Sequence, residues 1–330
     1  MYMKKYPCVY MRGGTSKAVF FHEKDLPEDK NLWDEIFLKV MGTPDVKQID
    51  GMGGTVSSTS KIAIISPSDR EDVDVNYTFK QVDIVIPRVD GSANCGNISS
   101  AVGPFAIDEG LVKAVEPITV VRVLNTNTNK IIEEHVRVED GHAMVHGDEV
   151  IKGVPGTGSR IDMYFEDPAG SKTGKLFPTG NKRDIFDVPG YGEIEVTVLD
   201  CSNPMVFIRA KDLGIKGTEL VELNQNKDVM EHIERIRCIA AQKCGFVENW
   251  EDARTKSTSA PKVSGAAGLH RHGQKRSKSR GHGYLLPSNF RRIPAQSLSD
   301  DRCSRNRGSS KNPGNHCQRD RETGTGSGYH

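Results

Sequence analysis

The stretch "ANCGNISSAVGPFAIDEG" (Ala93–Gly110) places a cysteine between two asparagines, directly before an apolar run. After Asn97, apolar residues recur with the i, i+3, i+4, i+7, i+8 spacing that buries one wide face of a helix, at Ile98, Ala101, Val102, Phe105 and Ala106. Because two serines are the only polar side chains in the first half, this pattern predicts a helix that is buried on nearly all sides. Pro104 removes one intrahelical hydrogen bond, so we expect a kink or a short helix at this point.

The sequence around this helix favours strands. Residues 72–79 alternate apolar and polar side chains, and the alternation continues through residues 82–86, which predicts half-buried strands. Residues 118–148 predict antiparallel strands joined at Asn/Thr and Asp-Gly turns. Residues 192–210 predict two more strands, separated by a Ser-Asn-Pro break.

Two further segments predict helices. Residues 31–42 have apolar residues at helical spacing and end at a glycine. Residues 227–245 carry an apolar side, with Asp228 as a candidate N-cap and Gly245 as the candidate residue after the C-cap. Residues 152–181, which are rich in Pro, Gly and Lys, show little regular pattern, so we expect a long loop or a linker there.

The charge of the chain is unevenly distributed. The 330 residues have a formal net charge of +1 and a mean hydropathy of −0.51. Residues 271–330 hold 13 Lys and Arg against 4 Asp and Glu, whereas residues 1–270 hold 32 against 40. Residues 1–270 are therefore mildly acidic, and residues 271–330 form a basic tail rich in Ser, Gly and Arg. Such a tail is typical of a disordered segment or of an arm that binds nucleic acid.

A third interpretation fits the composition of the tail better. Arg, Ser, Gly, His and Cys are what apolar codons often become when they are read one base out of frame. Codons permitted for Cys303–Asp320, read after the first base is dropped, give "AVAIAAAAKIPGTIV", an alanine-rich apolar helix with a Pro-Gly-Thr stop. We therefore expect residues 264–330 to be out of frame and disordered, and we exclude them from fold reasoning.

Composition also predicts a reduced, cytoplasmic protein. No apolar run approaches the ~20 residues of a membrane span, and the N-terminal stretch lacks an apolar region of signal-peptide length. The seven cysteines are an odd number without a CxxC pair, at positions 8, 95, 201, 238, 244, 303 and 317. This pattern favours free thiols over a disulfide framework or a zinc site, so we expect neither a metal nor membrane attachment.

Three stretches concentrate residues suited to chemistry: "MRGGTSKAVFF" (11–21), "DGMGGTVSSTSKIAII" (50–65) and "NCGN" (94–97). Each has a plain structural alternative. A Gly-Gly pair is usually only a turn, a lysine before a strand is usually a solvated edge charge, and a lone cysteine is more often a small buried hydrophobe than a catalyst. The second stretch does not match a nucleotide-binding loop, because the residues that flank Lys61 are not the required Gly and Ser or Thr.

The functional alternative combines the three stretches. A helix N-terminus leaves backbone N–H groups unpaired and carries partial positive charge, so Gly96 and Asn97 would present their amides to a carboxylate. The same field lowers the pKa of a thiol, which makes Cys95 a candidate to exchange a proton with the bound molecule. Lys61 on the opposite side would exchange the second proton if burial lowers its pKa. Two such groups flanking one carbon skeleton move a proton without a cofactor.

These residues resemble a known family. "NCGN" before a buried helix looks like the diaminopimelate epimerase fold, and the set "MRGGTSK", "TSKIAII", "NCGNISSAVGPFAIDEGLV" and "PTGN" resembles the PrpF family within that fold. This family includes 2-methylaconitate isomerase, 3-methylitaconate Δ-isomerase and 4-oxalomesaconate tautomerase. "DVKQIDG", "NTNTNK" and "GVPGT" look like the subgroup that acts on methylitaconate, and the resemblance runs from about Pro7 to Pro261.

The resemblance implies an α+β fold of two similar domains, each a curled mixed sheet around a central helix, with the active site in the cleft between them. It implies a cofactor-independent isomerase that moves a proton or a double bond in an unsaturated di- or tricarboxylate, with Lys61 and Cys95 as the catalytic acid/base residues. Ser16 matches a contact to a substrate carboxylate. The candidate substrate-binding residues are Ser16, Thr15, Gly96, Asn97, Asn94 and Ser60.

We predict three regions from these patterns. Residues 1–188 form a first epimerase-like domain with the acid/base candidates, residues 189–263 form the first part of a second, and residues 264–330 form the tail. Because the second domain is incomplete, the cleft would lose one wall and admit water, so we expect a poorly active or aggregation-prone chain. The out-of-frame helix looks like the "AxAxxAAxxIPGT" element of full-length family members.

Two alternatives remain open. An amino-acid racemase with two opposed cysteines would need a second catalytic thiol from Cys201, Cys238 or Cys244, none of which lies in a helix-mouth setting. A nucleic-acid-binding module would use the basic tail, which holds few aromatic residues for base stacking. Besides a small carboxylate substrate, the partner that we expect is a second copy of the chain.

Overall fold

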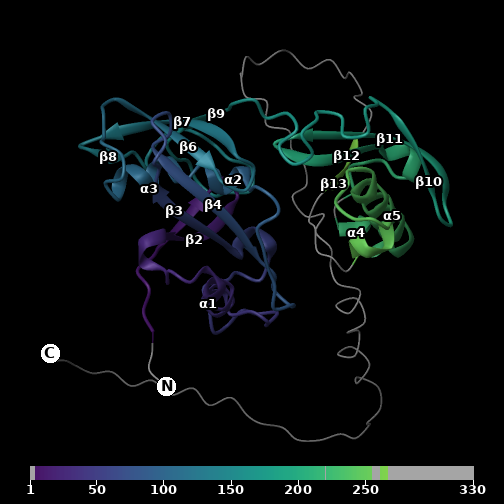
Figure 1. The fold of residues 1–330 in the computed structure, drawn as a ribbon, viewed down its shortest axis with the longest axis horizontal. Helices are drawn as coiled ribbons and strands as arrows, with labels where there is room; N and C mark the ends of the chain where they lie inside the picture. Colours follow the sequence, from purple (N-terminus) through teal and green to yellow (C-terminus); the bar gives the residue numbers. More distant parts are fainter. Residues whose placement is uncertain (1–3, 220, 255–260, 267–330) are drawn as a thin grey trace, which may run out of the picture. The chain divides into compact units, whose positions relative to one another are not determined.

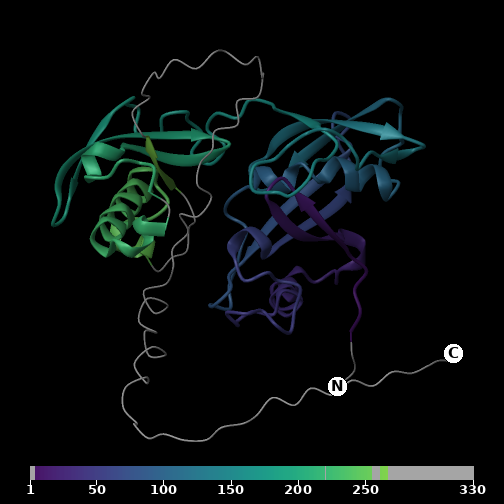
Figure 2. The same cartoon turned by 180° about the vertical axis from the view of Figure 1, so that it is seen from behind.

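Two sheets organise the part of the chain that the structure, a computed structural model, describes: residues 4–219, 221–254 and 261–266. Figures 1 and 2 show them from opposite sides. The strands are β1 (Val9–Gly13), β2 (Ser16–His22), β3 (Lys61–Pro67), β4 (Val75–Val82), β5 (Val89–Asp90), β6 (Ile118–Asn125), β7 (Lys130–Glu139), β8 (His142–Ala143), β9 (Ile161–Phe165), β10 (Asp184–Val188), β11 (Gly192–Cys201), β12 (Asn203–Arg209) and β13 (Lys262–Ala266). The helices are α1 (Trp33–Met41), α2 (Gly96–Ser99), α3 (Val102–Asp108), α4 (Val221–Gln225) and α5 (Lys227–Lys243), with 3-10 turns at Glu23–Asp25, Lys30–Leu32, Ser57–Thr59, Ala210–Leu213 and Trp250–Arg254.

The first sheet is mixed and has the order β1-β2-β3-β4-β6-β7-β8, with β5 paired to β4 and β9 paired to β7. The pairs β2–β3 and β4–β6 are parallel, and the other pairs are antiparallel. Because side chains alternate along a strand, the sheet buries both faces. Helices α2 and α3 pack on the inner face against Ala63, Tyr77 and Phe79. Helix α1 packs on the outer face against Val19 and Ile62.

The central helix is broken, as Pro104 predicted. Helix α2 ends at Ser99, and α3 begins at Val102. Pro104 is the third residue of α3, where a backbone N–H would have no intrahelical partner, so the ring costs no hydrogen bond at this place. The apolar residues of both pieces are buried in the inner core: Ile98, Ala101, Val102, Phe105, Ala106 and Ile107. The two short helices together therefore form the buried apolar surface that we predicted for one helix.

The second sheet has the order β10-β11-β12-β13 and packs against α5. Figure 1 shows α5 lying along this sheet, with α4 directly before it in the chain. The helix matches the prediction for residues 227–245, and Gly245 follows its C-cap with a φ of 76°. The N-cap prediction was wrong: Asn226, not Asp228, accepts a hydrogen bond from the Val229 N–H. Asp228 lies inside the first turn, where its negative charge stabilises the N-terminal end of the helix.

Two strand predictions need correction. The alternation through residues 82–86 does not continue the strand beyond Val82, the last residue of β4. The Asp83 carboxylate accepts hydrogen bonds from the N–H groups of Val85 and Ile86 and turns the chain. Strand β5 then returns antiparallel to β4. Conversely, the segment without a regular pattern contains β9, which pairs with β7. Its residues Ile161–Phe165 are mostly half-buried on both sides, so no alternation marked it.

The second sheet begins before the place where we put a boundary. Pro189 and Gly190 form the turn of the β10–β11 hairpin, with Gly190 at a φ of 76°, a backbone conformation that suits glycine. Strand β10 therefore belongs to the second sheet. At the other end, residues 264–266, predicted as part of the tail, extend β13 parallel to β12. The rest of the predicted tail, residues 267–330, lies outside the described residues, and so do the predictions of disorder and of nucleic-acid binding made for it.

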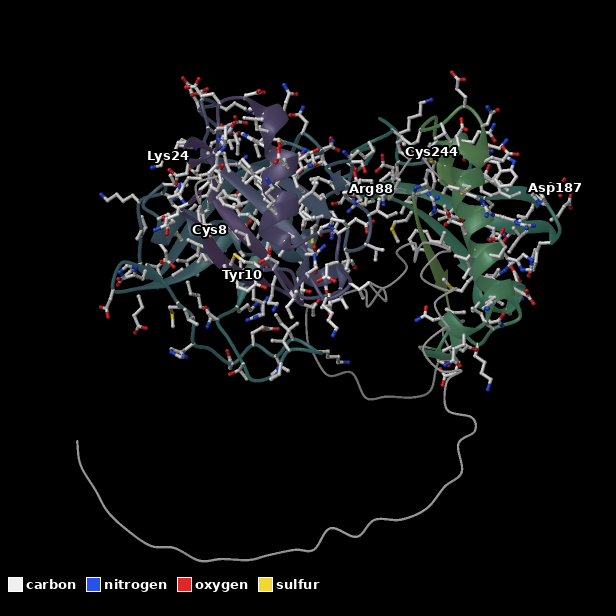
Figure 3. All side chains as sticks on the ribbon, turned by 90° about the horizontal axis from the view of Figure 1, so that it is seen from below. Cys8, Tyr10, Lys24, Arg88, Asp187 and Cys244 are labelled. Carbon is white, nitrogen blue, oxygen red and sulfur yellow. The ribbon has the colours of Figure 1, made fainter. Side chains whose placement is uncertain are left out.

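The cysteine prediction is confirmed where the structure describes the thiols. Cys8, Cys201, Cys238 and Cys244 form no disulfide, and Figure 3 labels Cys8 and Cys244. Cys303 and Cys317 lie outside the described residues.

Among the helices of residues 4–219 and 221–254, none combines the length and the apolar character of a membrane span.

Candidate active site

The Gly-Gly pair of "MRGGTSK" brings α2 against the β1–β2 hairpin. A Cβ atom on Gly13 would lie 2.3 Å from the Asn97 carbonyl oxygen and 2.9 Å from the Ile98 Cα. Gly14 has a φ of 52°, and its Cβ would lie 2.7 Å from Asn97 Oδ1. Both contacts are far shorter than real carbon contacts. The glycines are therefore required by packing, since any side chain would push the start of α2 away from the sheet.

Hydrogen bonds fasten this contact. Asn97 Nδ2 donates to Thr15 Oγ1 at 3.0 Å and to Ser16 Oγ at 3.4 Å. Thr15 is exposed, Asn97 is half-buried, and Ser16 is almost completely buried. The structure thus brings together three of the predicted substrate-binding residues, at the junction of the β1–β2 turn and the first turn of α2.

Lys61 begins β3 and points to the inner face of the sheet. Its side chain is only 6% exposed, its Nζ donates to Gln81 Oε1 at 2.5 Å, and it lies 5.1 Å from the centre of the Phe79 ring. The register pairs Lys61 with Gln81 across β3 and β4. A solvated edge charge, the plain alternative for this lysine, is excluded by that burial.

Cys95 is the N-cap of α2 and packs against the inner core that contains Tyr77 and Phe79. It is half-buried, and its carbonyl accepts from both the N–H and the hydroxyl of Ser99. Burial, with Cys95 as the next cause, raises the pKa of Tyr77 well above its ordinary value. The thiol is therefore only partly buried where it packs against the inner core. It borders the same inner face as Lys61.

The helix that follows Cys95 is short. Helix α2 has four residues, so it supplies one turn of aligned peptide dipoles instead of a long helix macrodipole. Gly96 and Asn97 still occupy its first two positions, whose N–H groups have no partner within a helix. Gly96 is exposed, and a Cβ added to it would meet no atom within 4 Å. Packing therefore does not explain this glycine, in contrast to Gly13.

Two predicted binding residues are committed to the fold. Ser60 is fully buried, and its hydroxyl accepts from Gln48 Nε2 at 2.8 Å. It stands next to Lys61 and points to the opposite face of the sheet, because side chains alternate along the strand. Asn94 is also buried, and its Oδ1 accepts from Asn125 Nδ2 at 2.8 Å. Both residues thus support the elements that carry Lys61 and Cys95.

Sequence reasoning missed Gln81, the partner of Lys61. A signal was present, since Gln81 continues the buried positions Val75, Tyr77 and Phe79 of β4. A polar residue at an inward position of a strand needs a hydrogen-bond partner. The alternation of apolar residues in β4 could not identify Lys61 as that partner.

A second missed residue is Glu134 on β7. It is fully buried, its Oε2 accepts from the Gly103 N–H at 2.9 Å, and burial raises its pKa to about 8.

Among residues 4–266 that are described, no group of three or more His, Cys, Asp or Glu side chains is arranged to hold a metal ion.

The second thiol needed by a two-cysteine racemase is not positioned at a helix start. Cys201 ends β11 and is exposed. Cys238 lies in the second half of α5, where burial raises its pKa to about 11. Cys244 is the C-cap of α5, and burial raises its pKa to about 12. None has the setting of Cys95.

Comparison with known proteins shows which family this chain is similar to. The family model described as "PrpF protein" matches residues 3–281. The chain is 52% identical over 262 residues to the putative isomerase YraM of Bacillus subtilis, covering 79% of this chain and 71% of that protein. It is 48% identical over 259 residues to the 3-methylitaconate isomerase of Eubacterium barkeri, covering 78% and 68%.

The fold of this chain is similar to that of a solved structure. The crystal structure of methylitaconate-delta-isomerase matches with a TM-score of 0.64 and 48% identity, over 78% of this chain and 67% of that one. The predicted epimerase-like fold is confirmed, and so is the prediction of an isomerase. On the family match over most of the chain and on these identities, this protein belongs to the PrpF family.

Proposed function

We propose that this isomerase moves a double bond, or changes its geometry, in an unsaturated di- or tricarboxylate, with Lys61 and Cys95 as the pair of acid/base residues. One residue takes a proton from the allylic carbon of the substrate. The electrons of that C–H bond form the new double bond, and the old double bond shifts its electrons toward the conjugated carboxylate. The other residue then gives a proton to the far carbon. One proton leaves and one returns, so no oxidant or reductant is consumed.

The position of Lys61 is the observation that carries this proposal. A buried amine, oriented by Gln81 over the Phe79 ring, borders the inner face to which Cys95 also contributes. A proton-transfer group must reach the substrate at hydrogen-bond distance and in a fixed direction. The acid/base roles of the two residues are proposed on this geometry and on the family motifs.

The substrate class rests on the relatives and on the start of α2. One relative is named a 3-methylitaconate isomerase, so 3-methylitaconate is the first substrate to test, followed by 2-methylaconitate. We propose that the backbone N–H groups of Gly96 and Asn97 receive a carboxylate, because an added Cβ at Gly96 meets no protein atom within 4 Å. Ser16 and Thr15 would contact the same or a second carboxylate through their hydroxyls.

The test uses a version of the protein whose tail is restored to frame. It compares Lys61→Ala and Cys95→Ser with the unchanged residues on both substrates, by the change in ultraviolet absorbance as the double bond moves. We expect turnover to fall by about 10²–10⁴-fold in each variant, the usual worth of general acid/base catalysis. Lys39→Ala, an exposed lysine of α1, and Cys201→Ser are the matched controls. Rates near those of the unchanged chain in both active-site variants would remove the proposed roles.

Further proposals accompany this one. We propose a cytoplasmic enzyme that needs neither metal nor coenzyme and that associates with a second copy of the chain. We also propose two domains, whose boundary we move from residues 188–189 to a place before β10, because β10 pairs with β11 in the second sheet. We propose in addition that the tail is out of frame. The nucleotide sequence around codons 255–265, read in all three frames, tests the last point directly. An intact coding frame through the tail would reject it.

A further inference from the structure

Gln81 accepts a hydrogen bond from the Lys61 amine, and its own surroundings are unusual. It is 3% exposed. Its Nε2 donates to three backbone carbonyl oxygens, those of Ser57 at 3.1 Å, Ser60 at 2.7 Å and Val82 at 3.2 Å. The amide is therefore held by the backbone on one side and faces the amine of Lys61 on the other.

This arrangement permits one orientation of the amide. A side-chain amide has a donor end and an acceptor end that are otherwise interchangeable. If the amide were turned over, Oε1 would face the carbonyl oxygens of Ser60 and Val82, and Nε2 would face the Lys61 Nζ. The contacts with the carbonyl oxygens would then bring acceptors together, and the contact with the ammonium form of Lys61 would bring donors together. The backbone thus fixes Gln81 as an acceptor for Lys61.

A glutamine at this place also differs from the usual partner of a buried lysine. A carboxylate would add a negative charge that favours the ammonium form of the amine. An amide oxygen accepts the same hydrogen bond without a full charge, so it directs the amine without committing it to one protonation state.

We propose that Gln81 is a positioning residue for the reaction: it holds the Lys61 amine in the direction of the substrate and lets it both lose and gain a proton. This inference rests on the proposed role of Lys61. It predicts that the identity of residue 81 controls the pH dependence of turnover, which a residue that only stabilises the fold would not do.

Two substitutions separate these effects. Gln81→Met keeps the length of the side chain but removes the acceptor, and we expect kcat to fall by about 10²-fold with KM nearly unchanged, because misplacing a catalytic group acts on the transition state. Gln81→Glu keeps an acceptor for Lys61 and adds charge, and its second oxygen replaces the donor to the carbonyl oxygens of Ser57, Ser60 and Val82. We therefore expect a lower Tm, with the limb of the pH–rate profile that belongs to the amine moved to higher pH.

Gln48→Met is the matched control. Gln48 is 1% exposed and donates through Nε2 to Ser60 Oγ and Thr43 Oγ1, while its Oε1 accepts from the Thr55 N–H. Its loss removes comparable buried hydrogen bonds beside the same strand and leaves the Lys61–Gln81 bond in place. We expect a lower Tm in this variant, with the pH midpoint of turnover unchanged.

The outcomes distinguish this inference from the proposed function. If Lys61→Ala abolishes turnover while Gln81→Met and Gln81→Glu keep the kcat and pH profile of the unchanged chain, the positioning role is wrong and the role of Lys61 stands. If Lys61→Ala keeps full turnover, the proposed acid/base role of Lys61 fails, and the positioning role of Gln81 fails with it. The ε-carbon NMR signal of Lys61 in isotopically labelled Gln81→Glu provides a second readout besides turnover. An unchanged pH titration of that signal would also overturn the inference, even if Gln81→Met does not fold.

Discussion

Replacement of Glu134 by glutamine should remove a pH dependence of stability that is built into the inner core. The carboxyl group is fully buried on β7, and one oxygen accepts from the Gly103 N–H of α3. The other oxygen, Oε1, has no hydrogen-bond partner within the described residues. Burial of such a group favours its neutral form, and the pKa rises from 4.5 to about 8.

The sign of the effect follows from the protons bound in each state. Between about pH 4.5 and pH 8, the folded chain keeps a proton on Glu134 that the unfolded chain releases. Stability from this group is therefore full below the unfolded pKa and is lost as the pH rises toward 8. Each pH unit of that interval lowers the free energy of unfolding by about 1.4 kcal/mol, which amounts to roughly 3 kcal/mol by neutral pH. A glutamine side chain at this position has no titrating proton, so Glu134→Gln should flatten the curve.

Urea unfolding at a series of pH values measures this effect. Trp33 packs on the outer face of the same sheet, and the chain has only one other tryptophan, Trp250. In a Trp250→Phe background, fluorescence therefore reports on the first sheet alone. We expect the stability advantage of Glu134→Gln to grow by about 1.4 kcal/mol per pH unit from about pH 5 to pH 7.

Glu133→Gln is the matched control on the neighbouring position of β7. Glu133 bonds to His135 and Arg122, which lower its pKa, so both states have lost its proton above about pH 5. This variant should keep the pH slope of the unchanged chain. Parallel curves for Glu134→Gln and the unchanged chain over the same range would refute the assignment of the slope to Glu134.

Four shorter predictions concern the packing and the proposed chemistry. Gly13→Ala should lower the free energy of unfolding in urea by about 1–3 kcal/mol and lower turnover, because its Cβ would collide with the Asn97 carbonyl. Gly96→Ala, whose Cβ meets no atom within 4 Å, should leave Tm unchanged and raise KM. Asp200→Asn should expose residues 171–174 to trypsin, since the buried carboxylate accepts four hydrogen bonds from residues 171–173. An unchanged cleavage rate would contradict this. Dialysis against a metal chelator should leave the rate of isomerisation unchanged, and a loss restored by added metal would reject metal independence.

Local patterns in the sequence predicted the elements that depend on neighbouring residues. Helix α1, the hairpin β6–β7, the glycine after α5 and the break before Pro104 were all readable, because each results from spacing, turn residues or a missing N–H within a few positions. The motifs around Lys61 and Cys95 also marked the start of a strand and the start of a helix, and the structure contains both.

Contacts between distant residues could not be read in this way. Gly13 looked like an ordinary turn glycine until the structure placed Asn97 against it. The bond from Gln48 to the hydroxyl of Ser60 joins residues 12 positions apart, and no local pattern indicated it. Gln81 became the partner of Lys61 only through the register of β3 with β4.

The sequence by itself determined which stretches carry the family motifs and which short segments are helix or strand, because propensity, capping and alternation are local properties of the chain. Only the tertiary structure decided which polar side chains face the inner core, which ones serve the fold, and which amide accepts from the buried amine. Those outcomes depend on strand register, since a shift of one residue turns every side chain of a strand to the other face.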